Sequence, residues 1–315
     1  MTTSPAETAR AAPVLLGLGC IWGASFLFIK VLVDETGPME VAFGRLVFGT
    51  AAIGGYFLVT RRPVKNLSRQ LLLQVSAISV VSLIAPFALI AWGEEHIDSG
   101  TASILNATMP IFTSIIAAAV LTEEHFTASR LFGLLLGFVG VGVLTGDDVF
   151  NITDENVLGQ LAVVGAACCY GIGAVLLRNV LRTSDAMSVS FLQVALGSLF
   201  ALPVTLAVTG GTPDYGLSLE AVGSLLGLGL LGTGLAYIMY IWLIENTGSV
   251  RASLVTYVVP PIAVVLGWIV LDESIGLNTV AGGLLIIAGV ASVMRGQAPG
   301  RRQAIAVAGV PASGE

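Results

Sequence analysis

Ten stretches of about 20 mostly apolar residues follow one another along this 315-residue chain. The hydrocarbon core of a bilayer is about 30 Å thick, and an α-helix, which rises about 1.5 Å per residue, crosses it in about 20 residues. Charged residues make up only 11% of the chain, whereas they make up about a quarter of a soluble domain. We therefore predict an all-α membrane protein with ten transmembrane helices. The expected spans are residues 13–33, 38–60, 70–92, 99–121, 130–146, 157–177, 186–209, 218–243, 249–271 and 278–295.

Composition excludes several other classes of protein. The net charge of −6, without a basic stripe, argues against nucleic-acid binding, and three cysteines are too few for a disulfide scaffold. The first apolar stretch is longer than a signal-peptide core and lacks a small-residue cleavage site, so we expect a retained helix. We expect no metal and no cofactor, because His96 and His125 belong to no ligand-spaced cluster. Glu94-Glu95-His96 is expected to be a solvated loop.

Basic residues indicate how the helices are oriented. Twelve of the 14 Lys and Arg residues lie in segments that would share one side of the membrane, while the loops on the other side are acidic. The remaining two, Lys30 and Arg45, lie inside predicted helices. Because cytoplasmic loops are enriched in Lys and Arg, we place both termini in the cytoplasm and expect a multi-pass protein of the inner cell membrane.

The chain also contains an internal repeat, in which residues recur at a displacement of 148 or 150 positions. Because each copy has five helices, an odd number, the second enters the membrane from the opposite side and the repeats are inverted. The predicted organisation is a cytoplasmic tail at 1–12, repeats at 13–147 and 157–296, and a disordered cytoplasmic tail at 297–315. Matched pairs include Cys20 with Cys168, Trp22 with Tyr170, Gly23 with Gly171, Ser99 with Ser249, Pro110 with Pro260 and Glu123 with Glu273.

Inverted repeats have a functional consequence. Two pseudo-equivalent halves can exchange conformations, so that one face closes while the other opens around a site near the membrane midplane. The repeat therefore predicts alternating access to a central site. A duplication without a transport role is the alternative interpretation.

Local motifs add a family resemblance. In the first two helices, an aromatic and small-residue run at 22–26 is followed by Lys30 and Arg45. Each half also has a mid-span proline, Pro110 or Pro260, followed by a Leu-x-Glu turn at 121–123 or 271–273 and then a glycine-rich helix. On these residues the chain resembles the drug/metabolite transporter superfamily, specifically its ten-helix EamA-type permeases, over residues 13–296. The resemblance implies a central cavity lined by helices 1, 3, 4, 6, 8 and 9, with helices 5 and 10 at the periphery. The motifs do not specify a substrate.

Intramembrane charges are the first candidate site residues, because each costs about 2.5–3.5 kcal/mol at a helix centre. Arg45 lies too deep to reach the interface easily, and Glu40 lies on another face of its helix. Arg45 should therefore face either a wet cavity or a carboxylate on another helix, as a substrate or gate contact or as a structural pair. Lys30 is expected to pair with Asp34, one turn away; the alternative is an anion-attracting group at the outer mouth.

Carboxylates are missing from the middle third of every predicted helix, since Glu40, Glu220 and Glu245 lie near helix ends. A cationic cargo would therefore lack a counter-charge, and a proton would lack a central acid or base. We expect a neutral, zwitterionic or weakly anionic cargo, whose carboxylate would meet Arg45.

Polar and aromatic residues at mid-depth complete the candidate site. The segments 106–110 and 256–260 are expected to be bent or unwound, because each proline frees a carbonyl group. Glu123 and Glu273 are expected to cap the next helix or to pair with a basic group. The predicted substrate-binding residues are Trp22, Ser25, Arg45, Asn106, Tyr170, Tyr237 and Tyr257. The predicted gating or hinge residues are Lys30, Pro110, Gln193 and Pro260.

These features predict a secondary transporter that exports small organic metabolites, with amino acids and similar zwitterions as the leading cargo. No ATP-binding motif is present, so transport would be gradient-driven or facilitated. The alternatives are a phosphorylated-metabolite or nucleotide-sugar carrier of the same fold, or a multidrug exporter. An intramembrane enzyme would need a catalytic acid, a metal cluster or an activated nucleophile in the bilayer, and the sequence offers none. The expected partners are a small-molecule substrate and the lipid bilayer but no nucleic acid, and the protein is expected to be a monomer or weak dimer.

Overall fold

The computed structural model describes residues 5–65, 67–120, 128–145, 154–211, 216–247 and 255–295. Within these ranges the chain is helical, with no β-strand. Seven helices are long and apolar enough to cross a membrane, and three shorter apolar helices complete the ten predicted spans. The predicted all-α membrane fold is therefore confirmed.

Each repeat contains five spans, some of which are built from several consecutive helical elements. The elements of the first repeat are α1 (Pro5–Val33), α2 (Pro38–Thr60), α3 (Arg69–Ser79), η1 (Val80–Ile84), α4 (Ala85–Glu94), α5 (Ser99–Asn106), α6 (Met109–Val120) and α7 (Ala128–Thr145). The elements of the second repeat are α8 (Glu155–Leu181), α9 (Ala186–Thr209), α10 (Leu219–Leu226), η3 (Gly227–Leu235), α11 (Ala236–Thr247), α13 (Val255–Val270) and α14 (Leu277–Arg295).

The third and eighth spans each contain a π-helical stretch between two α-helical pieces. A displacement of 148 carries η1, at residues 80–84, to residues 228–232, which lie inside η3. π-Helical turns are rare and are frequent at functional positions. Their recurrence at equivalent positions shows that the two repeats share local structure as well as sequence.

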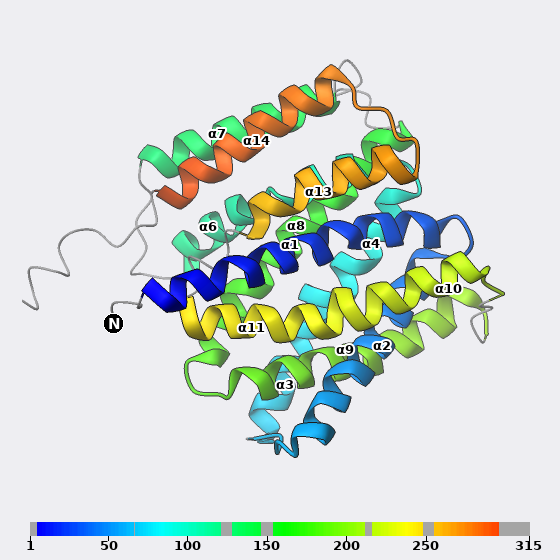
Figure 1. The fold of residues 1–315 in the computed structure, drawn as a ribbon, viewed down its shortest axis with the longest axis vertical. Helices are drawn as coiled ribbons and strands as arrows, with labels where there is room; N and C mark the ends of the chain where they lie inside the picture. The colour runs from blue at the N-terminus through cyan, green and yellow to red at the C-terminus, as the bar shows by residue number, and fades with distance from the viewer. Residues whose placement is uncertain are drawn as a thin grey trace, which may run out of the picture.

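Packing between helices repeats in the same way. Gly23 on α1 lies against α13, so that a methyl group on Gly23 would come within 2.6 Å of the Ile262 side chain. The equivalent residues, Gly171 on α8 and Phe112 on α6, approach equally closely, since a methyl group on Gly171 would lie 3.0 Å from the Phe112 Cβ. α1 and α13 accordingly run side by side in Figure 1. The two halves therefore pack with pseudo-twofold symmetry.

The last helices of the two repeats, α7 and α14, lie side by side along one edge of the bundle (Figure 1). Gly282, near the start of α14, packs against Gly140, while Gly289, further along α14, packs against Gly133 and Gly137. Residue numbers rise on one helix as they fall on the other, so the two helices are antiparallel. This is the arrangement that inverted repeats require, and the peripheral position agrees with the family resemblance.

The two mid-span prolines affect their helices differently. α5 ends at Asn106 and α6 begins at Met109, so the predicted break before Pro110 is confirmed. α13, in contrast, is a continuous α-helix across Pro260, so residues 256–260 are not unwound, and the alternative of a bend there stays a prediction. Pro260 lies within the first two turns of α13, where the loss of one backbone donor removes a single hydrogen bond near the helix end.

Large apolar side chains lie on the outside of the bundle as well as in its core. On α7 the exposed apolar residues include Phe132, Leu135, Phe138 and Val139. A soluble protein would bury such a stripe, whereas lipid tails are as apolar as these side chains. The outer surface of α7 is therefore a lipid-facing surface.

Candidate functional site

Arg45 lies at the contact between the two repeats. Its side chain is only 7% exposed, and its Nε donates a hydrogen bond of 2.8 Å to the hydroxyl group of Thr233 on η3. The guanidinium carbon lies 3.8 Å from the centre of the Phe87 ring on α4, which is a cation–π contact. Arg45 is thus held from α2 by groups on both repeats, and no ion pair to it is found among the described residues.

The glycine-rich sequence of η3 explains how Thr233 comes within reach of Arg45. A methyl group on Gly229 would lie 2.4 Å from the Phe48 Cβ, and one on Gly234 would lie 2.3 Å from the Ala52 Cβ. Only glycine permits this approach of η3 to α2. The close approach of the two backbones then brings the Thr233 hydroxyl to the Arg45 side chain.

Two predicted tyrosines lie close to Arg45. The side chains of Tyr170 on α8 and Tyr237 on α11 are near enough to interact electrostatically with Arg45 and with each other. The Tyr170 ring also packs edge-on against Phe87, with ring centres 6.4 Å apart. The structure therefore brings together three of the predicted substrate-binding residues from α2, α8 and α11.

Trp22 and Ser25 extend this cluster along η3. The Trp22 indole donates a hydrogen bond of 3.2 Å to the carbonyl oxygen of Gly232, the residue before Thr233, and its ring lies 5.4 Å from that of Tyr240. Ser25 is buried and donates to the carbonyl oxygen of Ile21 in its own helix. Trp22 therefore joins the group around η3, while the Ser25 hydroxyl is satisfied locally.

Gln193 makes the counterpart of the Arg45 contact. Its side-chain amide donates a hydrogen bond of 2.9 Å to the hydroxyl of Ser82 on η1, and its backbone carbonyl accepts one of 2.8 Å from Ser79. Arg45 bonds a hydroxyl on the π-helix of the second repeat, and Gln193 bonds one on the π-helix of the first. The equivalent residues Arg45 and Gln193 therefore both bond a hydroxyl on a π-helix, although Thr233 and Ser82 are not at equivalent positions, and only Arg45 carries a charge.

Lys30 does not make the pair expected from the sequence. Its ammonium group donates to the backbone carbonyl oxygens of Glu94 and Ile97, at 2.5 and 3.2 Å, and no ion pair joins it to the exposed Asp34. Lys30 caps the carboxyl end of α4, where backbone carbonyls lack helical partners and carry partial negative charge. The predicted solvated pair with Asp34 is therefore wrong.

Glu94 is the residue that the sequence interpretation missed. The sequence predicts a solvated loop here, and the neighbouring Glu95 is indeed exposed, but Glu94 is 0% exposed. Neither of its carboxyl oxygens has a hydrogen-bond partner. A buried acid is therefore present at the end of the third span, outside the middle third of the helices where the sequence predicts none. A signal was available, because the 150-residue displacement aligns Glu94 with the apolar Ile244.

The remaining predicted residues lie in other surroundings. Asn106 ends α5, and its side-chain oxygen is buried without a partner. Pro110 is the second residue of α6. Pro260 lines an apolar cavity of about 240 Å³ formed by residues of α5, α13 and α14, and does not join the Arg45 cluster. The side chain of Tyr257 lies outside the described residues.

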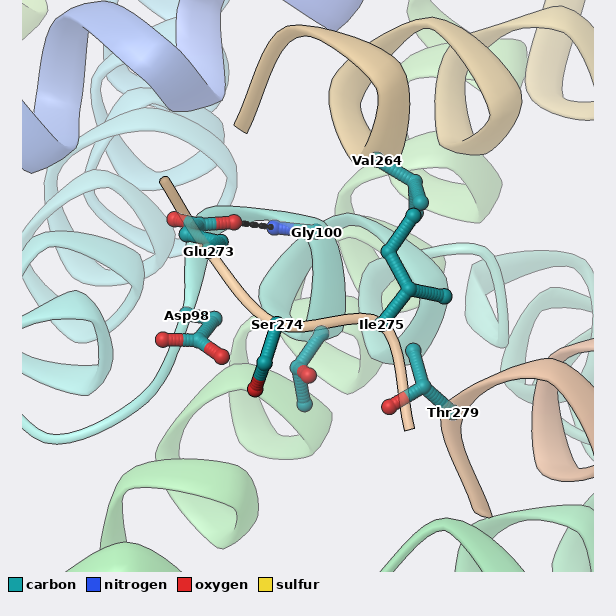
Figure 2. Close-up of a pocket in the computed structure, with 8 residues that line it drawn as sticks. Asp98, Gly100, Val264, Glu273, Ser274, Ile275 and Thr279 are labelled. Atoms are coloured by element: carbon teal, nitrogen blue, oxygen red, sulfur yellow. Dashed lines mark hydrogen bonds between the residues drawn. The ribbon is translucent and has the colours of Figure 1, made fainter. Parts of the chain in front are cut away.

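Glu273 links the second repeat to the first. Its carboxylate accepts hydrogen bonds of 2.7 and 3.1 Å from the backbone N–H groups of Ser99 and Gly100, at the start of α5. Figure 2 shows the second of these, between Gly100 and Glu273. Capping by Glu273 is therefore confirmed, but the capped helix is α5 and not the next helix along the chain. The equivalent residue Glu123 lies outside the described part of the chain.

Comparison with known proteins gives matches over most of the chain. The model of the EamA-like transporter family matches residues 10–146 and 157–295, once in each repeat. An uncharacterized transporter of Bacillus subtilis, YoaV, is 26% identical over 88% of this chain and 94% of its own length. A probable terminal-alkyne amino-acid exporter of Streptantibioticus cattleyicolor is 26% identical over 90% of this chain and 93% of its own length.

Two further comparisons extend this picture. An S-adenosylmethionine/S-adenosylhomocysteine transporter of Chlamydia muridarum is 26% identical over 81% of this chain and 82% of its own length. A solved crystal structure superposes with a TM-score of 0.61 and 16% sequence identity, covering 90% of this chain and 97% of the other. At this identity the structural likeness concerns the fold alone.

Proposed function

The chain belongs to the EamA-like transporter family and is a multi-pass membrane transporter of small metabolites, and from that membership we propose that it exports amino acids or closely similar zwitterions by alternating access. The two inverted repeats would rock against each other around the cluster at Arg45, with both termini in the cytoplasm and the protein in the inner cell membrane. No enzymatic activity is assigned to the chain.

The observation that carries this proposal is the environment of Arg45. A guanidinium group buried between the two repeats is a ready partner for a substrate carboxylate, because a charge-assisted, bidentate pair is strong where water is excluded. The aromatic rings of Trp22, Tyr170 and Tyr237 supply apolar walls with polar edges beside it. A small molecule bound there would contact both repeats, as alternating access requires.

Relatives support the same cargo class. One relative is named as a probable terminal-alkyne amino-acid exporter and another as a transporter of S-adenosylmethionine and S-adenosylhomocysteine. These compounds share the α-ammonium and α-carboxylate groups of an amino acid. A phosphorylated cargo is less favoured, because Lys30 already donates to two backbone carbonyls and leaves Arg45 as the basic group of the cluster.

The proposal is tested by reconstituting the protein in liposomes and measuring exchange of radiolabelled L-amino acids, taken singly from a panel of apolar and polar types. Replacing Arg45 with Gln or Trp22 with Ala should weaken uptake. For Arg45→Gln, loss of a charge-assisted hydrogen bond worth about 1.5–3 kcal/mol corresponds to about 10- to 150-fold in apparent affinity. Thr233→Val keeps the Arg45 charge but removes the hydroxyl that accepts its hydrogen bond, and should weaken uptake less than Arg45→Gln does.

Arg69→Gln is the matched control, because Arg69 is an exposed arginine at the start of α3. Uptake by this variant should equal that of the parent protein. Gel filtration of each variant separates a binding defect from misfolding. The proposal is wrong if the parent protein exchanges none of the amino acids, or if Arg45→Gln and Trp22→Ala both transport them normally.

A further inference from the structure

Among the described residues, Arg45 and Glu94 are the two Asp, Glu, Lys or Arg residues that are buried. Both belong to the first repeat, and their counterparts in the second, Gln193 and Ile244, carry no charge. The second repeat therefore folds in the same way without either charge. A costly buried charge that the repeated packing does not require is most readily explained by function.

The Glu94 carboxyl group lies enclosed without a partner. Lys30 is close to it, but the lysine uses its donors on the backbone carbonyls of Glu94 and Ile97, and neither carboxyl oxygen accepts a hydrogen bond. An ionised carboxylate without hydrogen bonds is far more costly to bury than a neutral acid. In this closed arrangement the stable form of Glu94 is the one that carries a proton.

The charged groups that act on Glu94 come from three of the elements around it. They are Lys30 on α1, Arg45 on α2 and Glu273, which follows α13. α8 packs against the preceding residue, because a methyl group on Gly93 would lie 2.6 Å from the Val163 side chain and 2.9 Å from the Gly159 carbonyl oxygen. Glu273 already accepts two backbone N–H groups, so Glu94 is the carboxyl group left to receive a proton or a new donor.

We propose that Glu94 is the coupling group of this transporter, which holds a proton in the empty protein and exchanges it for the ammonium group of a zwitterionic substrate. This inference rests on the proposed function. As the substrate binds, the O–H bond of the Glu94 carboxyl breaks, its proton passes to water, and the substrate ammonium donates a hydrogen bond to the resulting carboxylate. Arg45, whose charge acts on Glu94, receives the substrate carboxylate.

Competition between a proton and an ammonium group for one carboxylate makes the exchange obligatory. One proton moves inward for each zwitterion that leaves, so a single positive charge crosses the membrane per cycle. Export would then be driven by both the pH gradient and the membrane potential. The sequence predicts no acid or base at the centre of a span, and Glu94 supplies one at the end of the third span.

Proton release provides the first test. When L-phenylalanine or L-threonine is added to the purified protein in weakly buffered detergent solution, a pH-sensitive dye should report release of about one proton per bound substrate. Phenylpropionate, which lacks the ammonium group, should release none. Glu94→Gln should abolish the release, while Glu95→Gln, which changes the exposed neighbouring carboxylate, should leave it unchanged.

Coupled transport provides the second test. Vesicles with an interior one pH unit more acidic than the bath, and with the potential clamped, should accumulate L-phenylalanine about tenfold for one-for-one exchange. Glu94→Gln should lose this accumulation and retain exchange of labelled for unlabelled substrate, which a merely misfolded protein could not do. Glu94→Asp should restore part of the coupling. Normal pH-driven accumulation by Glu94→Gln, or accumulation driven by sodium instead of protons, would overturn the inference while leaving amino-acid transport in place.

Infrared difference spectroscopy makes the inference testable without a substrate. The protonated carboxyl band of the parent protein should disappear in Glu94→Gln and persist in Glu95→Gln. If no tested amino acid is exchanged by the parent protein, the proposed function fails, and this band still decides whether Glu94 holds a proton. Identical carboxyl bands in all three proteins would overturn the assignment to Glu94.

Discussion

Arg45 and Gln193 illustrate what a duplication preserves at single positions. Each side chain donates to a hydroxyl group on the π-helix of the opposite repeat, at 2.8 and 2.9 Å. Both repeats therefore use this position for a hydrogen bond to the opposite repeat, whereas the positive charge belongs to one half. Unpaired charges are costly inside a membrane, and this difference between equivalent residues is why we propose that the first repeat binds an ionic group.

Asp185 provides a contrasting case, in which a charge stabilises the end of a helix. It is the N-cap of α9 and accepts hydrogen bonds from the backbone N–H and the hydroxyl of Ser188 and from Arg62. Burial raises the pKa of Asp185, but the hydrogen bonds from Ser188 and Arg62 outweigh this effect and lower the pKa to about 2. The ionised form is thus the one that the fold stabilises.

The resulting stability depends on pH in a defined direction. The unfolded pKa of an aspartate is about 3.9, so a lowered folded pKa stabilises the protein above pH 4, and this contribution is lost as the pH falls through about 2. Asp185→Asn keeps an N-cap oxygen but removes the negative charge that Arg62 and Ser188 stabilise, so it should lower the free energy of unfolding by about 0.5–1 kcal/mol at pH 7. Thermal unfolding in detergent should show a gap to the parent protein that narrows below pH 4. Asp34→Asn, at an exposed position, should show no gap at either pH.

At the scale of helices, small residues determine where elements approach each other. η3 combines glycines at its contacts with α2 and a threonine within reach of Arg45, so one local sequence provides both the close packing and the polar partner. In a membrane, where the hydrophobic effect does not drive helices together, such close van der Waals packing supplies much of the association energy. The pairing of α7 with α14 depends on it most directly.

The α7–α14 contact predicts a large difference between two glycines. A methyl group on Gly289 would lie 2.6 Å from the carbonyl oxygen of Gly133 and 2.7 Å from the backbone nitrogen of Gly137, and backbone atoms cannot move aside. Gly289→Ala should therefore cost about 1–3 kcal/mol through overpacking. Gly142→Ala on α7 is the control, because a methyl group there meets nothing within 4 Å. Equal unfolding temperatures for the two variants in detergent would contradict this packing.

At the scale of the whole molecule, the two repeats are interlocked by polar contacts from each to the other. Arg45 and Gln193 bond π-helices across the boundary, and Glu273 from the second repeat caps α5 in the first. Contacts that can be made and broken between two otherwise rigid halves are what a rocking motion requires. Glu94 lies next to this boundary, so movement of the repeats would change its access to water.

The predicted topology places both ends of the chain on the cytoplasmic side. In a variant whose three native cysteines are replaced by alanine, Ser4→Cys and Ser313→Cys should each resist a membrane-impermeant maleimide added to intact cells and react after permeabilisation. Asp214→Cys, in a predicted outer loop, should react in intact cells. Labelling of one terminus alone from outside would contradict an even number of spans.

The sequence by itself determined the number, length and approximate ends of the spans, and the repeat that relates them. These are properties of contiguous residues, since a bilayer of fixed thickness selects apolar runs of fixed length and duplication leaves matching residues at a fixed displacement. The predicted spans 38–60 and 186–209 have the same bounds as α2 and α9, because Pro38 and Asp185 mark the starts of these helices in the local sequence.

Only the tertiary structure decided which polar groups are buried and what they meet. Glu94 and Glu95 are neighbours in the chain, yet α1, α8 and the segment holding Glu273 enclose the first and leave the second exposed. Lys30 binds a backbone carbonyl at the end of α4 and does not pair with Asp34, and Glu273 caps α5. In both cases the partner lies on a helix that is distant in the sequence. Burial is set by whatever packs over a residue, and no window of sequence around that residue contains this information.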